Sequence, residues 1–345
     1  MTSLPALKDR LNDLQTSDQS RTIIIDQLPI GYGGQLSRRL LGLKMALALD
    51  RMAVFLRDDD PPYIQSMERM FVGRHLDPSK DSRLLEMRDL TASSDEPILQ
   101  FEYFGAQSLL ANDNMTIERW VEVALARKYQ LTPSDLQKLD GLLLSWIRFL
   151  PNFERRLASD KLRLGLCDNT LGVHLRRGDK RVESPYVPAA ILNDEIARLH
   201  TRWPFERLFI ASDHPEADNI IEAPPGVEIV FDRTEIRHNN ANHKMLLSKP
   251  HLAAEETYVA FKNLRLLAAC GGIIGQNNAH LSTIAASCIY LRTNSNARST
   301  LLNGNIAKDR SQFLKVYYTL MLTSRHTVKR LLPRRIVRFI NRFLH

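Results

Sequence analysis

The sequence is poor in features that define whole classes of protein. It has only three cysteines, Cys167, Cys270 and Cys288, and no CxxC pair, which argues against a disulfide framework and against a cysteine-rich zinc site. No stretch approaches the roughly 18 consecutive apolar residues of a membrane span. The first residues, MTSLPALKDRLNDLQ, lack the apolar core of a secretory signal. We therefore expect a cytoplasmic protein whose thiols stay reduced.

Acidic residues are missing from the C-terminal end. The last 21 residues hold seven lysines and arginines and no acid, so they account for most of the net charge of +8. The rest of the chain is nearly neutral, which argues against a nucleic-acid partner. Residues 328–344 mix these cations with apolar side chains, as a basic amphipathic helix does. We expect this tail to lie on an anionic membrane surface, as on the inner face of a membrane; docking on the body or on a partner is the alternative.

The first half of the chain predicts a parallel sheet. A β-branched run at 22–26 leads into the glycine turn Gly31-Tyr32-Gly33-Gly34, a helix at 35–49 and a second strand at 52–56. Residues 63–130 show only helical fragments, such as 116–128. A long helix is expected at 133–157, with Thr132 as its N-cap and a kink or break at Pro151.

The second half repeats the alternation of strands and helices. Strands are expected at 171–175, 207–211, 227–231, 272–274 and 288–291, and helices at 188–200, 255–269 and 279–286. The pattern predicts an α/β protein with two Rossmann-like domains. We place an N-terminal α/β domain at 20–150, a nucleotide-binding domain at 151–305, and C-terminal helices with the basic tail at 306–345.

The segment GVHLRRGDKRVE, residues 172–183, is the most specific motif. An apolar strand ends there, and four cations follow at its carboxyl end: Arg176, Arg177, Lys180 and Arg181. Ligands of open α/β sheets bind at that edge, and arginine suits bidentate phosphate recognition. A phosphate site is the favoured interpretation, and a solvated charged loop is the alternative.

Three further turns carry weaker signals. The glycine turn would let a pyrophosphate approach the backbone, but it is neither a full GxGxxG nor a P-loop, so an ordinary tight turn is equally compatible. The strand 209–211 runs into Ser212 and Asp213, and GIIGQNNAHLS at 272–282 places Asn277 and Asn278 before a helix. Taken singly, each of these is more typical of ordinary loop chemistry.

Two patterns suggest metal binding but are better explained otherwise. Asp58-Asp59-Asp60 resembles a DxD metal motif, yet it precedes two prolines in the N-terminal domain. His238, His243 and His251 have irregular spacing in a polar loop. We expect no metal site.

The motifs GYGGQL, HLRRGDK, IASDHP and GQNNAHLS, in this order, resemble those of the α-1,6-fucosyltransferase family. That family includes the core and rhizobial nodulation enzymes, and the resemblance runs from about Thr22 to Leu291. It implies an inverting transferase of GT-B-like architecture that uses GDP-fucose, a glycan or glycolipid acceptor, and no metal or other cofactor.

The resemblance also implies roles for individual residues. Arg176 would grip the β-phosphate, while Lys180 and Glu183 would lie at the acceptor hydroxyl, with Glu183 as the base and Asp179 as its rival. The donor would be bound by the following residues: Gly33, Gly34, His174 beside the guanine, Arg177, Asp213, Asn277 and Asn278.

The chain departs from the family pattern in places. Lys262 stands where the family has an acid that reads guanine, with Glu255 and Glu256 further back, and asparagines replace two serines at 277 and 278. Two alternatives therefore stay open. The donor is another nucleotide sugar, or the protein binds a nucleotide sugar at the membrane without turnover.

Overall fold

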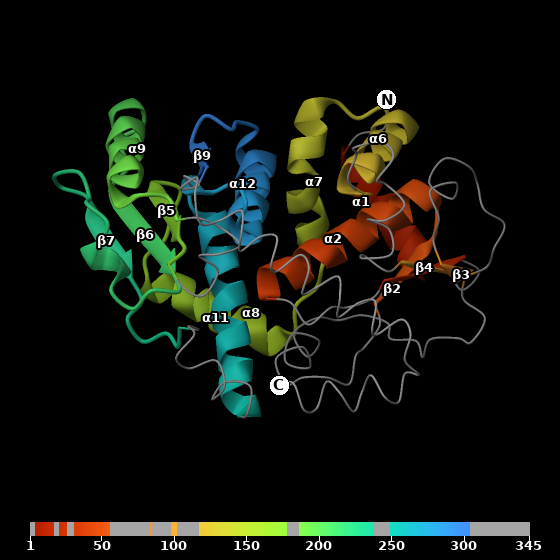
Figure 1. The fold of residues 1–345 in the computed structure, drawn as a ribbon, viewed down its shortest axis with the longest axis horizontal. Coiled ribbons are helices and arrows are strands. Elements are labelled where there is room, and N and C mark those ends of the chain that lie inside the picture. Colours follow the sequence, from red (N-terminus) through yellow and green to blue (C-terminus); the bar gives the residue numbers. More distant parts are fainter. Residues whose placement is uncertain are drawn as a thin grey trace, which may run out of the picture.

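A computed structural model describes residues 4–16, 21–25, 31–55, 83–84, 98–101, 117–177, 186–237 and 249–303. The chain forms two parallel β-sheets with helices packed around them (Figure 1). This confirms the α/β class and the two sheets expected from the sequence. The predicted C-terminal helix and its basic tail lie outside the described residues.

The first sheet has four strands in the order β2-β1-β4-β3. They are β1 (Thr22–Ile25), β2 (Met52–Phe55), β3 (Arg83–Leu84) and β4 (Ile98–Phe101). All its pairings are parallel, with Ile23 opposite both Ala53 and Leu99. Strand β1 is buried along its whole length, which explains its unbroken apolar sequence.

Helix α2 (Tyr32–Leu49) connects β1 to β2 and is packed by α1 (Leu4–Thr16), α6 (Ile117–Tyr129) and α7 (Pro133–Trp146). In α1 the buried residues are Leu7, Leu11 and Leu14, one stripe of a helix. The N-cap of α7 is Thr132, as expected, in a capping box with Asp135.

The second sheet has five parallel strands in the order β7-β6-β5-β8-β9. They are β5 (Thr170–Leu175), β6 (Arg207–Ser212), β7 (Glu228–Phe231), β8 (Gly272–Gln276) and β9 (Ser299–Leu302), accompanied by α9 (Ala189–Arg202), α11 (Pro250–Ala269), α12 (His280–Thr293) and the short helix η2 (Ala217–Asn219). From β5, the next strands along the chain, β6 and β7, extend the sheet in one direction, and the later strands β8 and β9 extend it in the opposite direction. The direction therefore switches between β5 and β8, where such sheets open a crevice at their carboxyl edge.

The break expected at Pro151 is confirmed and separates two helices, α7 and α8 (Pro151–Arg163), because Pro151 occupies the first turn of the new helix, where a missing N–H costs nothing. One expectation needs correction. The strand expected at 288–291 is wrong, since these residues belong to α12 and the last strand is β9. A short apolar run fits a buried helix as well as a strand.

One apolar cluster reaches both sheets, from Leu11 of α1 through Leu40 of α2 to Ile284 of α12. A second cluster joins β5, β6 and α9 of the second sheet and includes Leu171, Ile196 and Ile210. Helix α7 packs closely on α12, where the Gly141 N–H donates to Ser287 Oγ at 2.9 Å. This packing fixes α2 relative to the second sheet. Of the described helices, none is both long and apolar enough to span a membrane.

Candidate functional site

The carboxyl edge of the second sheet gathers most of the described residues singled out from the sequence. Arg176 and Arg177 follow β5, Asp213 follows β6, and Asn277 follows β8. Leu175 pairs with Ser212, so β5 and β6 end side by side. The strand ends therefore bring Arg177 and Asp213 into contact, although they are 36 residues apart.

Arg177 and Asp213 fix the turn that follows β5. The Arg177 backbone N–H donates to Asp213 Oδ1 at 2.6 Å, and its guanidinium donates to the Val187 carbonyl at 2.6 Å. Tyr186 stacks under that guanidinium at 5.1 Å and donates its hydroxyl to the Arg177 carbonyl at 2.8 Å. These contacts give Arg177 and Asp213 a structural role at the edge of the sheet, in addition to the contacts with the nucleotide sugar that the sequence predicts for them.

The Arg176 side chain is also half-buried, and its buried Nε has no hydrogen-bond partner among the described residues, as is true of Nη1 of Arg177. A buried donor left without a partner costs about 1–3 kcal/mol, and more when it is charged. Arg176 thus places a guanidinium group, suited to bidentate phosphate recognition, at the switch point of the sheet.

His174 is the penultimate residue of β5, two residues before Arg176. Its Nδ1 lies 2.6 Å from Ser282 Oγ, in the first turn of α12. Burial, and secondarily the charge of Arg176, lower the pKa of His174 to about 3. The imidazole is therefore neutral at physiological pH.

The first turns of α2 and α12 meet at the same place. A Cβ built on Gly33 would lie 3.4 Å from His280 Cβ and 3.5 Å from Leu281 Cγ. Neither first turn contains an acid, and neither N-cap residue makes a side-chain cap. The positive ends of two helix dipoles thus converge near Arg176, an arrangement that favours an anion.

The two glycines predicted to bind the donor, Gly33 and Gly34, differ in their surroundings. Gly33 faces α12, whereas the Gly34 N–H already donates to the Gly31 carbonyl at 2.9 Å. Arg176 also influences His280 at the start of α12, because desolvation and the Arg176 charge lower the pKa of that imidazole.

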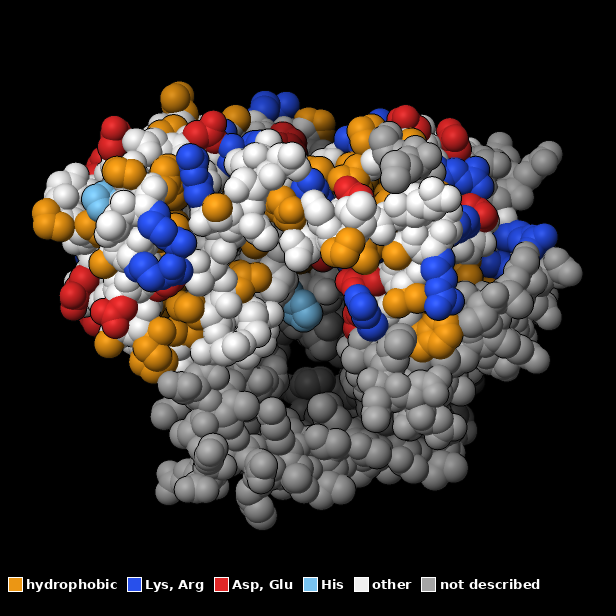
Figure 2. All heavy atoms as spheres, turned by 90° about the horizontal axis from the view of Figure 1, so that it is seen from above, with side chains coloured by type: hydrophobic (Ala, Val, Ile, Leu, Met, Phe, Trp, Pro, Cys, Tyr) orange, Lys and Arg blue, Asp and Glu red, His pale blue; other side chains and the backbone are white. Residues whose placement is uncertain are grey.

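The space-filling view shows a hollow between the two halves of the molecule, with a histidine side chain at its edge (Figure 2).

The asparagines after β8 are exposed. The Asn277 amide donates to Asn303 Oδ1, and the Asn277 backbone N–H donates to the Leu302 carbonyl at 3.1 Å. Asn277 thereby ties the ends of β8 and β9 together. Asn278 presents its side chain to solvent at the same edge.

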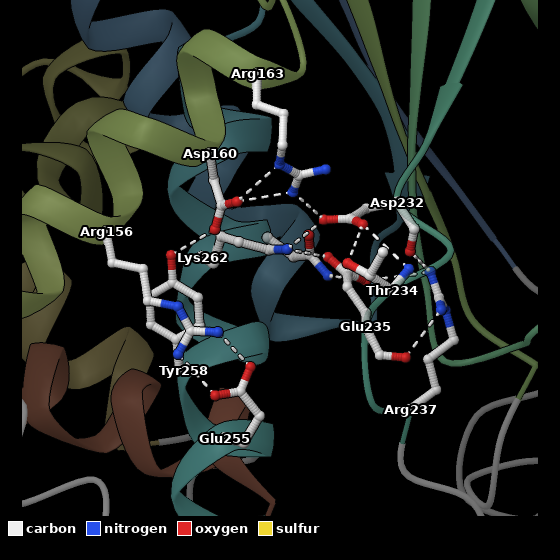
Figure 3. Close-up of polar contacts among 11 residues, drawn as sticks. Arg156, Asp160, Arg163, Asp232, Thr234, Glu235, Arg237, Glu255, Tyr258 and Lys262 are labelled. Atoms are coloured by element: carbon white, nitrogen blue, oxygen red, sulfur yellow. Dashed lines mark hydrogen bonds and ion pairs between the residues drawn. The ribbon is translucent and has the colours of Figure 1, made fainter.

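Lys262 belongs to an ion network that the sequence did not reveal. It is only 2% exposed, and its Nζ lies 2.9 Å from Asp232 Oδ2 and 2.6 Å from Glu235 Oε1. The network joins α8, α11 and the segment after β7 (Figure 3), and includes Arg163, whose guanidinium lies 2.5 Å from Asp232. Lys262, which the resemblance aligns with a guanine-reading acid, is thus part of an internal ion pair.

The two carboxylates that contact Lys262 differ in the direction of their pKa shifts. Burial opposes ionisation of Asp232, but hydrogen bonds from Arg163 and its neighbours outweigh it and hold the pKa below its usual range. Burial raises the pKa of Glu235, and the pairing with Lys262 only partly offsets it. One sequence feature pointed to this network: Asp232 is an acid directly after a strand. Its partners Lys262 and Arg163 could not be identified from the sequence, because they lie 30 and 69 residues away.

Several predicted residues fall outside the described part of the chain. They are Asp179, Lys180, Arg181 and Glu183 of the segment GVHLRRGDKRVE, the Asp58–Asp60 triplet, His238 and His243. Among the residues that are described, no group of three or more His, Cys, Asp or Glu side chains is placed to hold a metal ion.

Comparison with known proteins gives a likeness of fold. No protein-family model matches the chain, and no curated protein matches it. Among solved structures, the fucosyltransferase NodZ from Bradyrhizobium aligns at 12% identity and TM-score 0.48, over 77% of this chain and 92% of its own. POFUT1 in complex with GDP-fucose aligns at 13% identity and TM-score 0.47, over 84% and 99%. Arabidopsis thaliana FUT1 in complex with GDP aligns at 11% identity and TM-score 0.47, over 83% and 73%. At such identities and TM-scores, the likeness is one of general architecture only.

Proposed function

We propose that the chain is a glycosyltransferase that moves fucose from GDP-fucose to a hydroxyl of a glycan or glycolipid. The observation that carries the proposal is the surroundings of Arg176. Its buried Nε lacks a described partner, and it lies at the switch point of a parallel sheet beside two helix N-termini without acids. Such a place suits the diphosphate of a nucleotide sugar.

Departure of the nucleotide is the step that this arrangement serves. When the bond between the anomeric carbon and the phosphate oxygen breaks, negative charge grows on the diphosphate. Preorganised donors and positive dipoles aimed at that charge lower the barrier. Arg176 would supply the cation, so we propose that the reaction proceeds without a metal ion.

Transfer also requires an acceptor and a base. The acceptor oxygen would attack the anomeric carbon opposite the diphosphate, which inverts the configuration, and a base would take the hydroxyl proton. We assign this role to Glu183, with Lys180 at the acceptor and Asp179 as the rival base. All three belong to the segment 178–185, which joins Arg177 to Tyr186, and both of those residues lie at this edge.

The nature of the donor rests on the motifs. His174, next to Arg176, is the residue that the resemblance places beside guanine, and as a neutral imidazole it can hydrogen-bond a base without adding charge. Another nucleotide sugar at the same site is the first alternative. A protein that binds the nucleotide sugar without turnover is the second.

The basic tail belongs to the proposal as a membrane contact. Residues 328–344 would hold the enzyme on an anionic inner surface, where lipid-linked acceptors lie. Truncation before Ser324 should move the protein from the membrane pellet to the soluble fraction. Unchanged fractionation would contradict this part of the proposal.

A donor screen tests the proposed function. The purified chain should release GDP from GDP-fucose in the presence of EDTA, faster than it releases nucleotide from GDP-mannose or a UDP-sugar. Preference for another donor would favour the first alternative. GDP binding without release from any donor, with candidate glycan acceptors supplied, would favour the binding protein.

A further inference from the structure

His174 and Ser282 form one hydrogen-bonded unit across the boundary between β5 and β8. Ser282 is completely buried in the first turn of α12, and its Oγ lies 2.6 Å from His174 Nδ1. The same Oγ accepts the backbone N–H of Gln276, the last residue of β8, at 3.2 Å. The unit therefore spans the switch point of the sheet.

Only one placement of the hydrogens gives every donor in this pair of side chains an acceptor. A serine hydroxyl has one hydrogen to donate, and an N–H such as that of Gln276 can only donate to it. Among the described residues, His174 Nδ1 is the one remaining partner of the Ser282 hydroxyl. Were Nδ1 protonated, the buried hydroxyl hydrogen would be left unpaired, which disfavours that form by about tenfold or more.

Gly275 makes room for the unit. A Cβ built on Gly275 would lie 2.4 Å from Ser282 Oγ and 2.7 Å from Ser282 Cβ. Both distances are far below van der Waals contact, so any larger residue at 275 would displace the hydroxyl. The glycine of GIIGQNN thus serves hydrogen bonding between α12 and β5.

We infer that Ser282 is a positioning residue that holds His174 as the neutral Nε2–H tautomer. The ring then offers a single donor, Nε2–H, to an acceptor atom of the ligand at the switch point, such as a keto or phosphate oxygen. Only the contact with a nucleotide rests on the proposed function, because the tautomer is a property of the ligand-free chain. A ring of fixed tautomer needs no rearrangement when the nucleotide binds.

Nitrogen NMR of the ligand-free protein tests the tautomer directly. In ¹⁵N-histidine-labelled protein, the resonances lost in His174→Gln identify this ring among the ten histidines. We expect a protonated Nε2 and an unprotonated Nδ1. A protonated Nδ1 overturns the inference.

Variants of Ser282 test the positioning role. Ser282→Ala should give shifts averaged between tautomers and weaken GDP binding by about 3–10-fold, the range of one hydrogen bond. Ser282→Thr, which keeps the hydroxyl, should restore both within about twofold. An alanine variant with unchanged shifts and unchanged affinity overturns the inference. If no GDP binds to the wild type but the shifts respond as stated, the proposed function fails and the positioning role stands.

Discussion

The Lys262 ammonium lies 2.9 Å from the Asp232 carboxylate, and both side chains are almost completely buried. Glu235, also buried, approaches the same ammonium at 2.6 Å. An ion pair taken from water in this way gains little over a well-packed apolar pair, but removal of one partner leaves an uncompensated charge. Lys262 is therefore a structural residue of the segment that follows β7.

The Lys262→Met variant should be strongly destabilised. It leaves two buried carboxylates without their shared cation, so we expect the free energy of unfolding to fall by about 3–5 kcal/mol. Urea denaturation at neutral pH measures the change. Arg156→Ala is the control, because in its pair with Glu255 the side chains are 49% and 34% exposed, and such a pair should contribute at most about 1 kcal/mol. If both variants lost the same free energy of unfolding, the buried ion network would contribute no more to stability than the partly exposed pair.

Gly141 should tolerate no side chain. A Cβ at this position would lie 2.7 Å from the Ser287 carbonyl oxygen and 2.8 Å from Cys288 Cα, both backbone atoms of α12. Gly141→Ala should therefore cost about 1–3 kcal/mol of unfolding free energy, because α7 must move away from α12. Gly31→Ala is the matched control, since a Cβ there meets nothing within 4 Å. A thermally stable Gly141→Ala protein would contradict the close helix contact.

His174 should make stability depend on pH. Its folded pKa, about 3, lies below the ordinary value of 6.5, so the unfolded chain binds a proton that the folded chain does not. Stability should then be lost as the pH falls from about 6.5 toward 3, at up to roughly 1.4 kcal/mol per pH unit. In His174→Gln this contribution disappears, whereas that of His280, of the same sign, remains. Urea denaturation of both proteins at pH 7.5 and pH 5 should show the steeper decline in the wild type, and parallel declines would contradict the low pKa.

Much of the second sheet could be predicted from sequence because its central strands β5, β6 and β8 are buried and apolar and end in polar residues. The same pattern located Arg176, Arg177 and Asp213 at one edge. Helix α1 was missed although Leu7, Leu11 and Leu14 repeat at helical spacing. Strand β3 is only two residues long, too short for a periodic signal. Strand β4 was also not predicted, although it is as long as β1 and β2.

The contacts that define the site could not be predicted, because they join distant parts of the chain. His174 and Ser282 are 108 residues apart, and Lys262 and Asp232 are 30 apart. Sequence pattern predicts which face of an element is buried, but not which hydroxyl meets which imidazole across a sheet. For the same reason, the sequence showed that Lys262 stands where the family has an acid, but not that Asp232 and Glu235 pair with it.

The charge and the shape of Arg176 should both matter for nucleotide binding. Arg176→Lys keeps the positive charge but loses the planar fork that grips phosphate in two places. We expect its affinity for GDP to fall between those of the wild type and Arg176→Ala. Calorimetric titration measures the three affinities, and a lysine variant equal to the wild type would show that a point charge suffices.

The most direct test of the account is the rate of GDP release from GDP-fucose by Arg176→Ala. Arg127→Ala, an exposed arginine on α6, serves as the control, and melting temperatures verify that both variants fold. The account predicts a loss of about 100-fold or more in kcat for Arg176→Ala, the effect of removing one donor from a developing negative charge, and no loss for the control. A folded Arg176→Ala enzyme that releases GDP at the wild-type rate would contradict it.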